Sequence, residues 1–279
     1  MLVRRRGQML VAAILIVGLI VMSFLLVTYH THALFLRTRG LVVRETVGAV
    51  TADFNRALAA MLALATRSYY NHTRFSDFVS RFEDQGLEPG NLSSAGLVAA
   101  RFIENWATAA RVIFAEQGLQ LAWALEPPRV LHLLGRAPEP LQNPVILIDW
   151  NKTAAGSYIS GWMRLNLTNA GFYNWETRSL IGFTLIIDTF YSSNSTVRLR
   201  ALVDNGTYYG ALLARGWVEL YYFDSSAEKW VKAKIKDVTY EGFGYYRITV
   251  EERLRRGTRF LIVASDERGI LVLAQSTVP

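Results

Sequence analysis

One uninterrupted apolar stretch, Met9 to Val27, most constrains what this chain can fold into. It reads MLVAAILIVGLIVMSFLLV and holds no charged residue across nineteen positions. At a helical rise of about 1.5 Å per residue, this length matches the roughly 30 Å hydrocarbon core of a bilayer. The stretch therefore predicts a single transmembrane helix, since no second apolar run of this length follows it.

The residues on either side of the stretch predict its orientation. Arg4, Arg5 and Arg6 precede it, and basic residues stay on the cytoplasmic side of a membrane. Tyr29 and His30 follow it, and such amphipathic side chains settle at the membrane–water interface. We therefore expect a single-pass cell-membrane protein with a cytoplasmic N-terminus and an extracellular C-terminal region.

Acceptor sequons for N-glycosylation agree with that orientation. All of them lie beyond the apolar stretch, and they are more numerous than the one or two that composition predicts, although Asn, Ser and Thr also share turns and strand ends. The predicted acceptors are Asn71, Asn91, Asn151, Asn166, Asn194 and Asn205.

Three interpretations of the first 35 residues compete. A cleaved secretory signal needs an apolar core of only about 7–15 residues and a small-residue cleavage site. This core is longer, and Thr31-His32-Ala33 is a poor site. An uncleaved signal anchor fits the hydrophobicity well.

The third interpretation rests on Arg4-Arg5-Arg6-Gly7-Gln8, which runs directly into the apolar stretch. This arrangement resembles the class III signal peptide of archaeal type IV pilins and related surface-filament proteins. The resemblance covers about thirty residues and implies peptidase cleavage between Gly7 and Gln8. Bacterial relatives usually carry Glu at the fifth mature position, where this chain has Ala12, so the resemblance is closer to the archaeal branch.

Composition bounds the remaining possibilities. At 279 residues and 51% apolar content, the chain can build a transmembrane element and one or two folded units. The net charge of +7 includes the three leader arginines, and what remains is too small and scattered to predict nucleic-acid binding. The chain has no Cys, so core packing must hold an exported domain together without disulfides.

Two helical stripes follow the apolar stretch. The first predicts an amphipathic helix continuing outward from the membrane. Its apolar residues recur at steps of three and four: Val47, Val50, Phe54, Leu58, Met61, Ala65 and Tyr69. Gly40 and Gly48 weaken the case for continuity. After a turn at 84–91, Ser93 or Ser94 caps a second predicted helix that spans 98–124 and stops at Pro127, which favours a helical hairpin.

From residue 129 the period changes to that of strands. Apolar runs alternate with turn signals, including Arg215-Gly216, while the stretch 170–178 reads as a loop carrying Tyr173 and Trp175. Met163, Leu165 and Leu167 share one face of a predicted strand, which leaves Asn166 toward solvent. The eleven predicted strands occupy 130–134, 145–150, 158–168, 181–190, 197–203, 208–213, 217–223, 229–236, 245–251, 259–264 and 270–274.

The predicted fold class is therefore α+β: a transmembrane helix that continues into a helical hairpin, followed by an antiparallel β-sandwich. The expected domains are a basic cytoplasmic leader (1–8), the transmembrane helix (9–28), an extracellular helical stalk (29–128) and the β-sandwich (129–279).

The sequence offers little catalytic chemistry. His30 and His32 would point apart on a helix, and Glu251 and Glu252 would face opposite sides of a strand. No zinc-helix motif, nucleophile elbow or phosphate loop occurs, so we predict no catalytic residue, metal or cofactor. The arginines at 253–259 read as a solvated hairpin tip or as a grip for acidic polysaccharide or a partner.

These observations predict a non-enzymatic extracellular structural protein, a pilin-like subunit or minor component of a cell-surface assembly. Its expected partners are the membrane, copies of itself or other surface proteins through the N-terminal helix, and glycans. The alternatives are a signal-anchored binding or envelope glycoprotein that stays in the membrane and, less favoured, an anchored hydrolase with dispersed catalytic residues.

Overall fold

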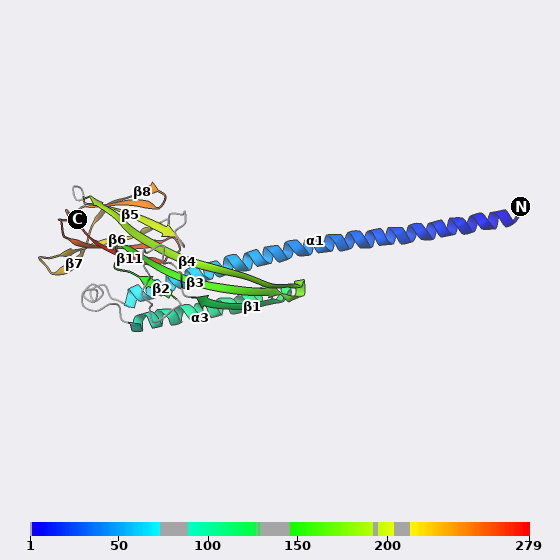
Figure 1. The fold of residues 1–279 in the computed structure, drawn as a ribbon, viewed down its shortest axis with the longest axis horizontal. Coiled ribbons are helices and arrows are strands. Elements are labelled where there is room, and N and C mark those ends of the chain that lie inside the picture. The colour runs from blue at the N-terminus through cyan, green and yellow to red at the C-terminus, as the bar shows by residue number, and fades with distance from the viewer. Residues whose placement is uncertain (1, 73–88, 127, 129–145, 192–194, 204–212) are drawn as a thin grey trace.

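A computed structural model describes the chain except residues 1, 73–88, 127, 129–145, 192–194 and 204–212. One long helix, α1 (Leu2–His72), projects from a domain formed by the rest of the described chain (Figure 1). Its C-terminal part lies inside the domain, while its N-terminal end lies far from it. The helix α1 therefore has two parts: a projecting part outside the domain, which we call the shaft, and a C-terminal part in the domain core.

The buried part of α1 follows the predicted stripe. Phe54, Leu58 and Met61 are fully buried, as is Tyr69 near the end of the helix. Gly40 and Gly48 do not break the helix, and a Cβ added at either would meet nothing within 4 Å. The predicted outward continuation of the helix is confirmed, because burial of this stripe outweighs about 1 kcal/mol of helix propensity lost per glycine.

A second helix, α3 (Pro89–Ile113), packs against α1. Ile103, Ala107 and Ala110 face the core, and the Trp106 ring lies 5.5 Å from that of Phe54. The helix begins at Pro89, before the predicted caps Ser93 and Ser94. Proline suits a first helical position, because its fixed φ is helical and its missing N–H is not needed there.

The strands form two antiparallel sheets. The larger has the order β1-β3-β4-β5-β9-β8, with β2 also paired to β3, and the smaller has the order β11-β10-β6-β7. The strands are β1 (Leu119–Glu126), β2 (Ile146–Asp149), β3 (Ala154–Leu167), β4 (Phe172–Tyr191), β5 (Thr196–Val203), β6 (Leu213–Asp224), β7 (Lys229–Lys232), β8 (Ile235–Gly242), β9 (Tyr245–Val250), β10 (Arg259–Asp266) and β11 (Leu271–Thr277).

Buried hydrogen bonds connect α1 and the two sheets. Ser157 Oγ on β3 donates to the Leu271 carbonyl at 2.7 Å and accepts from Trp150 Nε1 at 2.9 Å. The backbone N–H of the same residue, Leu271 on β11, donates to Thr66 Oγ1 of α1 at 3.2 Å. Because β11 also contacts β3 and β4, one strand joins the helix to both sheets.

The second helix was predicted to reach residue 124, and this is wrong beyond Ile113. A short 3₁₀ turn, η1 (Ala115–Gln117), follows, and Gly118 takes a left-handed φ of 66°. The chain then reverses into β1, whose Leu119 and Leu121 are buried while Gln120 is exposed. Gln117, Leu121 and Ala124 continue the three- and four-residue spacing of the helical stripe, which is why the spacing wrongly indicated more helix. This strand precedes the predicted domain boundary at 128.

Three strand predictions also need correction. Residues 172–178, predicted as a loop, begin the long strand β4, and Arg215-Gly216, predicted as a turn, lies within β6. The run 229–236 is two strands, because the chain leaves the smaller sheet after Lys232 and enters the larger at Ile235. Lys232 and Lys234 are exposed and Ala233 between them is buried, so the predicted alternation holds across that break. The predicted strand at 130–134 lies outside the described residues.

The predicted α+β class with mostly antiparallel strands is confirmed. The alternation predicted for β3 also holds, since Met163, Leu165 and Leu167 are buried. The domain therefore has a well-formed core, centred on α1, that leaves the projecting part of the helix uncovered.

Candidate functional site: the exposed apolar segment of α1

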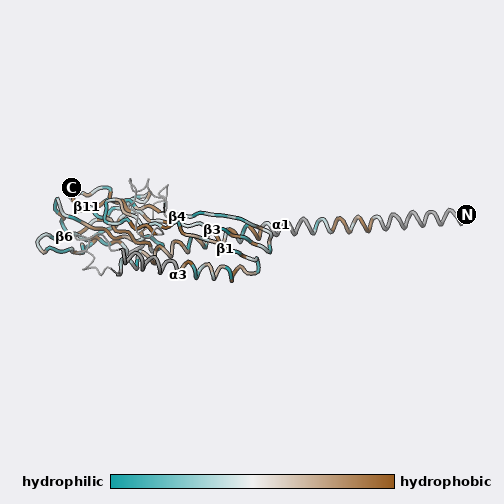
Figure 2. The backbone as a smooth tube through the Cα atoms, turned by 60° about the horizontal axis from the view of Figure 1, so that its bottom comes forward, coloured by the Kyte–Doolittle hydropathy of each residue, from teal (hydrophilic) through white to brown (hydrophobic). Residues whose placement is uncertain are grey.

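The described segment Gly18–Thr31 of α1 exposes large apolar side chains on every side. Leu19, Phe24 and Leu26 are each 67–73% exposed, and Figure 2 shows this hydrophobic stretch on the projecting shaft, away from the domain. Soluble monomers rarely expose contiguous apolar surface of this extent. The segment is therefore the strongest candidate for a functional surface in the described chain.

Two threonine hydroxyls of this segment are hydrogen-bonded within the helix. Thr28 Oγ1 donates to the Phe24 carbonyl at 2.8 Å, and Thr31 Oγ1 donates to the Val27 carbonyl at 2.7 Å. Such bonds four residues back along the helix hide a hydroxyl from an apolar environment. These two hydroxyl groups therefore need no water partner.

Within the described residues, one helical stretch is long and apolar enough to cross a membrane by length and composition: Gly40–Arg67, with a mean hydropathy of 1.3. Half of it is buried inside the protein, where Phe54 and Leu58 form the domain core. The segment Gly18–Thr31 of the same helix is also apolar but shorter. The side chains of residues 2–17, which include half of the predicted span Met9–Val27, lie outside the described set.

The predicted cleavage residues Gly7 and Gln8 lie within α1, and their side chains are not described. Among the predicted acceptors, Asn71 lies near the end of α1 and Asn91 near the start of α3, likewise without described side chains. Asn194 and Asn205 lie outside the described residues. Only Asn151 and Asn166 can be compared as acceptors.

These two asparagines differ in how far their side chains are engaged. On β3, Asn166 Nδ2 donates to Gln120 Oε1 at 3.3 Å, and Asn166 Oδ1 accepts from the Asn174 N–H at 2.7 Å. Asn151 lies between β2 and β3 with a left-handed φ of 64°, at a partly exposed position next to exposed Thr153. Asn151 makes no side-chain hydrogen bond within the described residues and its Oδ1 is buried, whereas a glycan at Asn166 would have to replace the bond to Gln120.

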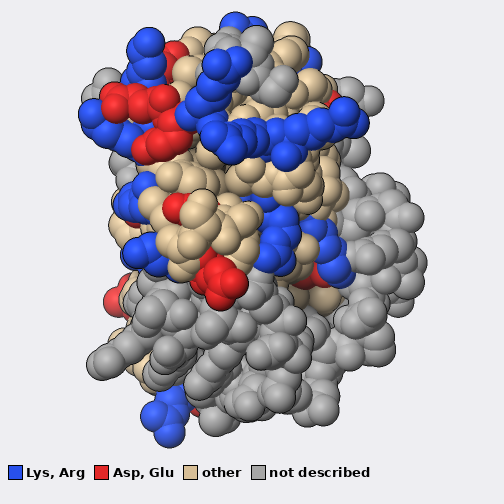
Figure 3. Space-filling model, turned by 90° about the vertical axis from the view of Figure 1, so that its left-hand side faces the viewer, with Lys and Arg blue, Asp and Glu red and all other residues tan. Residues whose placement is uncertain are grey.

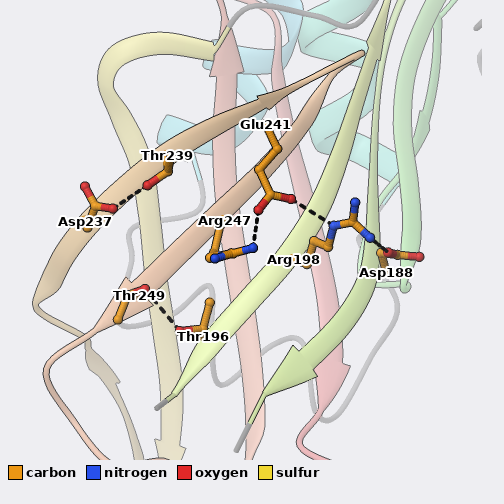
Figure 4. A network of polar contacts seen from close by, with 8 residues as sticks. All are labelled: Asp188, Thr196, Arg198, Asp237, Thr239, Glu241, Arg247 and Thr249. Carbon is orange, nitrogen blue, oxygen red and sulfur yellow. Dashed lines mark hydrogen bonds and ion pairs between the residues drawn. The ribbon is translucent and has the colours of Figure 1, made fainter.

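Four charged side chains of the larger sheet pair with one another. Arg198 on β5 donates through Nε to Glu241 at 3.0 Å and through Nη1 to Asp188 at 3.3 Å, and Arg247 also pairs with Glu241 (Figure 4). The hydrogen bond to Glu241 raises the pKa of Arg198. Because Arg198 and Arg247 are direct partners across β5 and β9, Glu241 relieves a like-charge contact. This network serves the sheet rather than catalysis.

A buried carboxylate closes the turn between β10 and β11. Asp266 is 2% exposed, and its Oδ1 accepts from the N–H groups of Arg268 and Ile270, both at 3.0 Å. Burial raises the pKa of Asp266, and the charge of Arg268 opposes that rise. Arg268 Nη2 also donates to the Gly182 carbonyl on β4 at 2.6 Å, so the pair fastens this turn to the larger sheet.

Buried tyrosines are the other strongly shifted groups. Tyr158 on β3 is fully buried, its hydroxyl is hydrogen-bonded to Thr184, and its ring fills the space beside Gly156 and Gly182. Burial raises the pKa of Tyr158 to about 12, and the hydrogen bond to Thr184 opposes the rise. A phenol with so high a pKa stays neutral at ordinary pH and stabilises the core instead of donating a proton.

Tyr158 gives an alkaline stability prediction. Below pH 10 both states keep the proton, but between pH 10 and 12 the unfolded chain ionises first, so the free energy of unfolding falls as pH rises. This group should contribute a loss on the order of 2–3 kcal/mol by pH 12. Tyr158→Phe should flatten the decline measured by denaturant titration, whereas Tyr173→Phe, at an exposed position, should leave it unchanged. Parallel curves for wild type and Tyr158→Phe would contradict the assignment.

Within the described residues, no three His, Asp or Glu side chains gather as a metal site would require. His30 is exposed on the shaft, and the other three His side chains are not described. Glu251 and Glu252 both engage Lys234, through its Nζ at 2.8 Å and its N–H at 3.0 Å respectively. These adjacent carboxylates therefore hold the crossing between β7 and β8.

Comparisons with protein-family models, curated proteins and solved structures find no match to this chain. Functional inference therefore rests on the geometry above and on the leader residues.

Proposed function

We propose that this chain is a non-enzymatic, membrane-anchored extracellular structural protein, a pilin-like subunit or minor component of a cell-surface assembly. The observation that carries the proposal is one continuous helix whose C-terminal part is domain core and whose described segment Gly18–Thr31 exposes an apolar surface. Burying each large apolar side chain of that surface contributes roughly 1.5–3 kcal/mol. Such a surface needs either lipid or other copies around it.

The helix also sets the spacing between membrane and domain. The helix α1 is unbroken between Val27, the end of the apolar stretch, and Thr46, the first of its described residues that is buried. This part of α1 spans roughly 28 Å at the helical rise per residue. In this proposal, Arg4 to Arg6 keep the N-terminus cytoplasmic. The domain, with its two sheets as a β-sandwich and α1 and α3 as a helical hairpin, stands clear of the outer surface.

The resemblance of the leader to archaeal type IV pilins supports assembly over permanent anchoring. Cleavage between Gly7 and Gln8 would remove the three arginines and leave the apolar segment as the start of the mature chain. Copies could then pack their apolar segments together, driven by removal of apolar surface from water. The alternative is a signal-anchored binding or envelope glycoprotein whose helix stays in lipid.

Cysteine crosslinking separates the two proposals, because the chain has no Cys of its own. A single Leu26→Cys variant should form disulfide-linked dimers on mild oxidation of sheared surface material, since assembled helices lie side by side. Val112→Cys, which is 72% exposed on α3 of the domain, is the matched control and should link much less. If Leu26→Cys stays monomeric and shielded from aqueous thiol reagents, the permanent anchor is favoured and assembly is contradicted.

A further inference from the structure

The loop that joins β9 to β10 carries three arginines within four residues: Arg253, Arg255 and Arg256. All three are exposed. The loop is hydrogen-bonded to the last residues of the chain, because Gly257 N–H donates to the Val278 carbonyl at 2.9 Å. The C-terminus lies at the end of the molecule opposite the N-terminus of α1 (Figure 1). These arginines therefore lie at the domain end farthest from the apolar segment, which we call the distal end.

The loop is held in one shape. Between the arginines, Leu254 is 4% exposed, and its N–H donates to Ser195 Oγ at 3.0 Å. Thr258 N–H donates to the Arg255 carbonyl at 3.1 Å, and the Thr258 carbonyl accepts from Val278 N–H at 2.9 Å. A buried leucine flanked by arginines directs the charged side chains outward. The backbone that presents them is thus ordered before any ligand arrives.

Nearby carboxylates are engaged elsewhere. Glu251 and Glu252 hold Lys234, and Asp224 accepts from Ser226 N–H at 2.9 Å. Among the described residues, no salt bridge involves Arg253, Arg255 or Arg256. Figure 3, which views this end, shows Lys and Arg gathered in a band on the described surface. Like charges so close together repel one another, so their grouping favours a role in binding over one in stability.

We propose that Arg253, Arg255 and Arg256 of the distal loop bind the carboxylate groups of a linear acidic polysaccharide. Guanidinium groups match carboxylates in a planar, two-bond geometry, and several along a rigid loop suit a repeating polyanion. Single-stranded nucleic acid is disfavoured, because its binding uses exposed aromatic platforms. Here Phe223 and Trp230 are partly buried and Arg259 lies 4.6 Å from the Phe223 ring. This inference does not depend on the apolar segment and goes beyond the structural role.

The test measures binding of the full chain in detergent micelles to immobilised polygalacturonate at low ionic strength. A triple variant, R253Q with R255Q and R256Q, should bind at least about tenfold more weakly, since three charge-assisted contacts are lost. The matched control, R44Q with R56Q and R101Q, removes the same charge from exposed positions on α1 and α3 and should bind nearly as wild type. The charge-preserving triple, R253K with R255K and R256K, should bind more weakly than wild type but more tightly than the glutamine triple, because it keeps the charge and loses the two-bond geometry.

Three results would overturn the proposal. The glutamine triple could bind as wild type, or the control triple could lose as much affinity, which would mean that net charge alone acts. Single-stranded DNA could compete as well as free polygalacturonate, which would replace the polysaccharide by a general polyanion.

Thermal unfolding of each triple should match wild type, because these side chains make no core contact. Should the glutamine triple misfold, the single variant R255Q would provide the comparison.

Discussion

Replacing Ile20 and Phe24 together by aspartate is expected to move the protein out of the membrane fraction. An aspartate near the middle of a membrane-spanning helix costs about 2.5–3.5 kcal/mol, so two should lower insertion by more than about a hundredfold. Both side chains are more than 60% exposed on the shaft. Measurement by carbonate extraction and flotation of membranes from expressing cells would show the loss directly.

The matched control for this variant replaces Val112 and Val238 by aspartate. These residues are 72% and 41% exposed on the domain, so the control adds the same charge outside the apolar segment. It should remain in membranes and unfold at the wild-type temperature. Retention of the Ile20 and Phe24 variant in membranes, at wild-type levels, would show that the apolar segment does not anchor the chain.

A second large effect is expected within the same helix from Phe54→Ala. Phe54 is fully buried and its ring lies 5.5 Å from that of Trp106, and truncation of such a phenylalanine costs about 3–5 kcal/mol. The free energy of unfolding of the domain, measured by denaturant titration in detergent, should fall by that amount. Membrane partition of the folded fraction should not change.

Phe24→Ala is the matched control for Phe54→Ala, thirty positions earlier in α1. Phe24 is 73% exposed and contributes nothing to the domain core, so domain stability should stay within about 0.5 kcal/mol of wild type. Its effect should appear in membrane partition or assembly instead. Equal loss of domain stability in both variants would contradict the division of α1 into a core half and an exposed apolar half.

The parts of the fold that depend on local pattern could be predicted from the sequence. The stripe through Phe54 and Met61 showed which side of α1 is buried, and the alternation around Met163 and Leu165 showed the inward face of β3. In both cases the burial period is a property of consecutive residues. Continuity of α1 past Gly40 and Gly48 was less secure, because it depends on tertiary packing.

Features that depend on partners distant in sequence could not be predicted. Leu121 and Ala124 continue the helical spacing of α3 as well as they fit a strand, until β3 is present to pair with β1. The break after Lys232 separates strands of two different sheets, which only the sheet topology reveals. Arg198 meets Glu241, which lies 43 positions later in the chain, so neither residue carries a local signal for the contact.

The candidate site shows the same contrast. The apolar stretch was plain in the sequence because membrane affinity depends on composition over about twenty residues. The rigid presentation of Arg253 and Arg255 was not, because it requires hydrogen bonds to the loop from Ser195, just before β5, and Val278, just after β11. The role of a residue that depends on contacts with residues distant in sequence can therefore be recognised only when the fold is known.

The most direct test of the central claim is intact-mass analysis and N-terminal sequencing of the protein from native membranes and from sheared surface material. We expect a mature chain that begins at Gln8 in the sheared fraction, as processing and assembly of a pilin-like subunit require. A chain that keeps Arg4 to Gly7 and occurs only in membranes would contradict the pilin-like proposal and leave a signal-anchored surface protein.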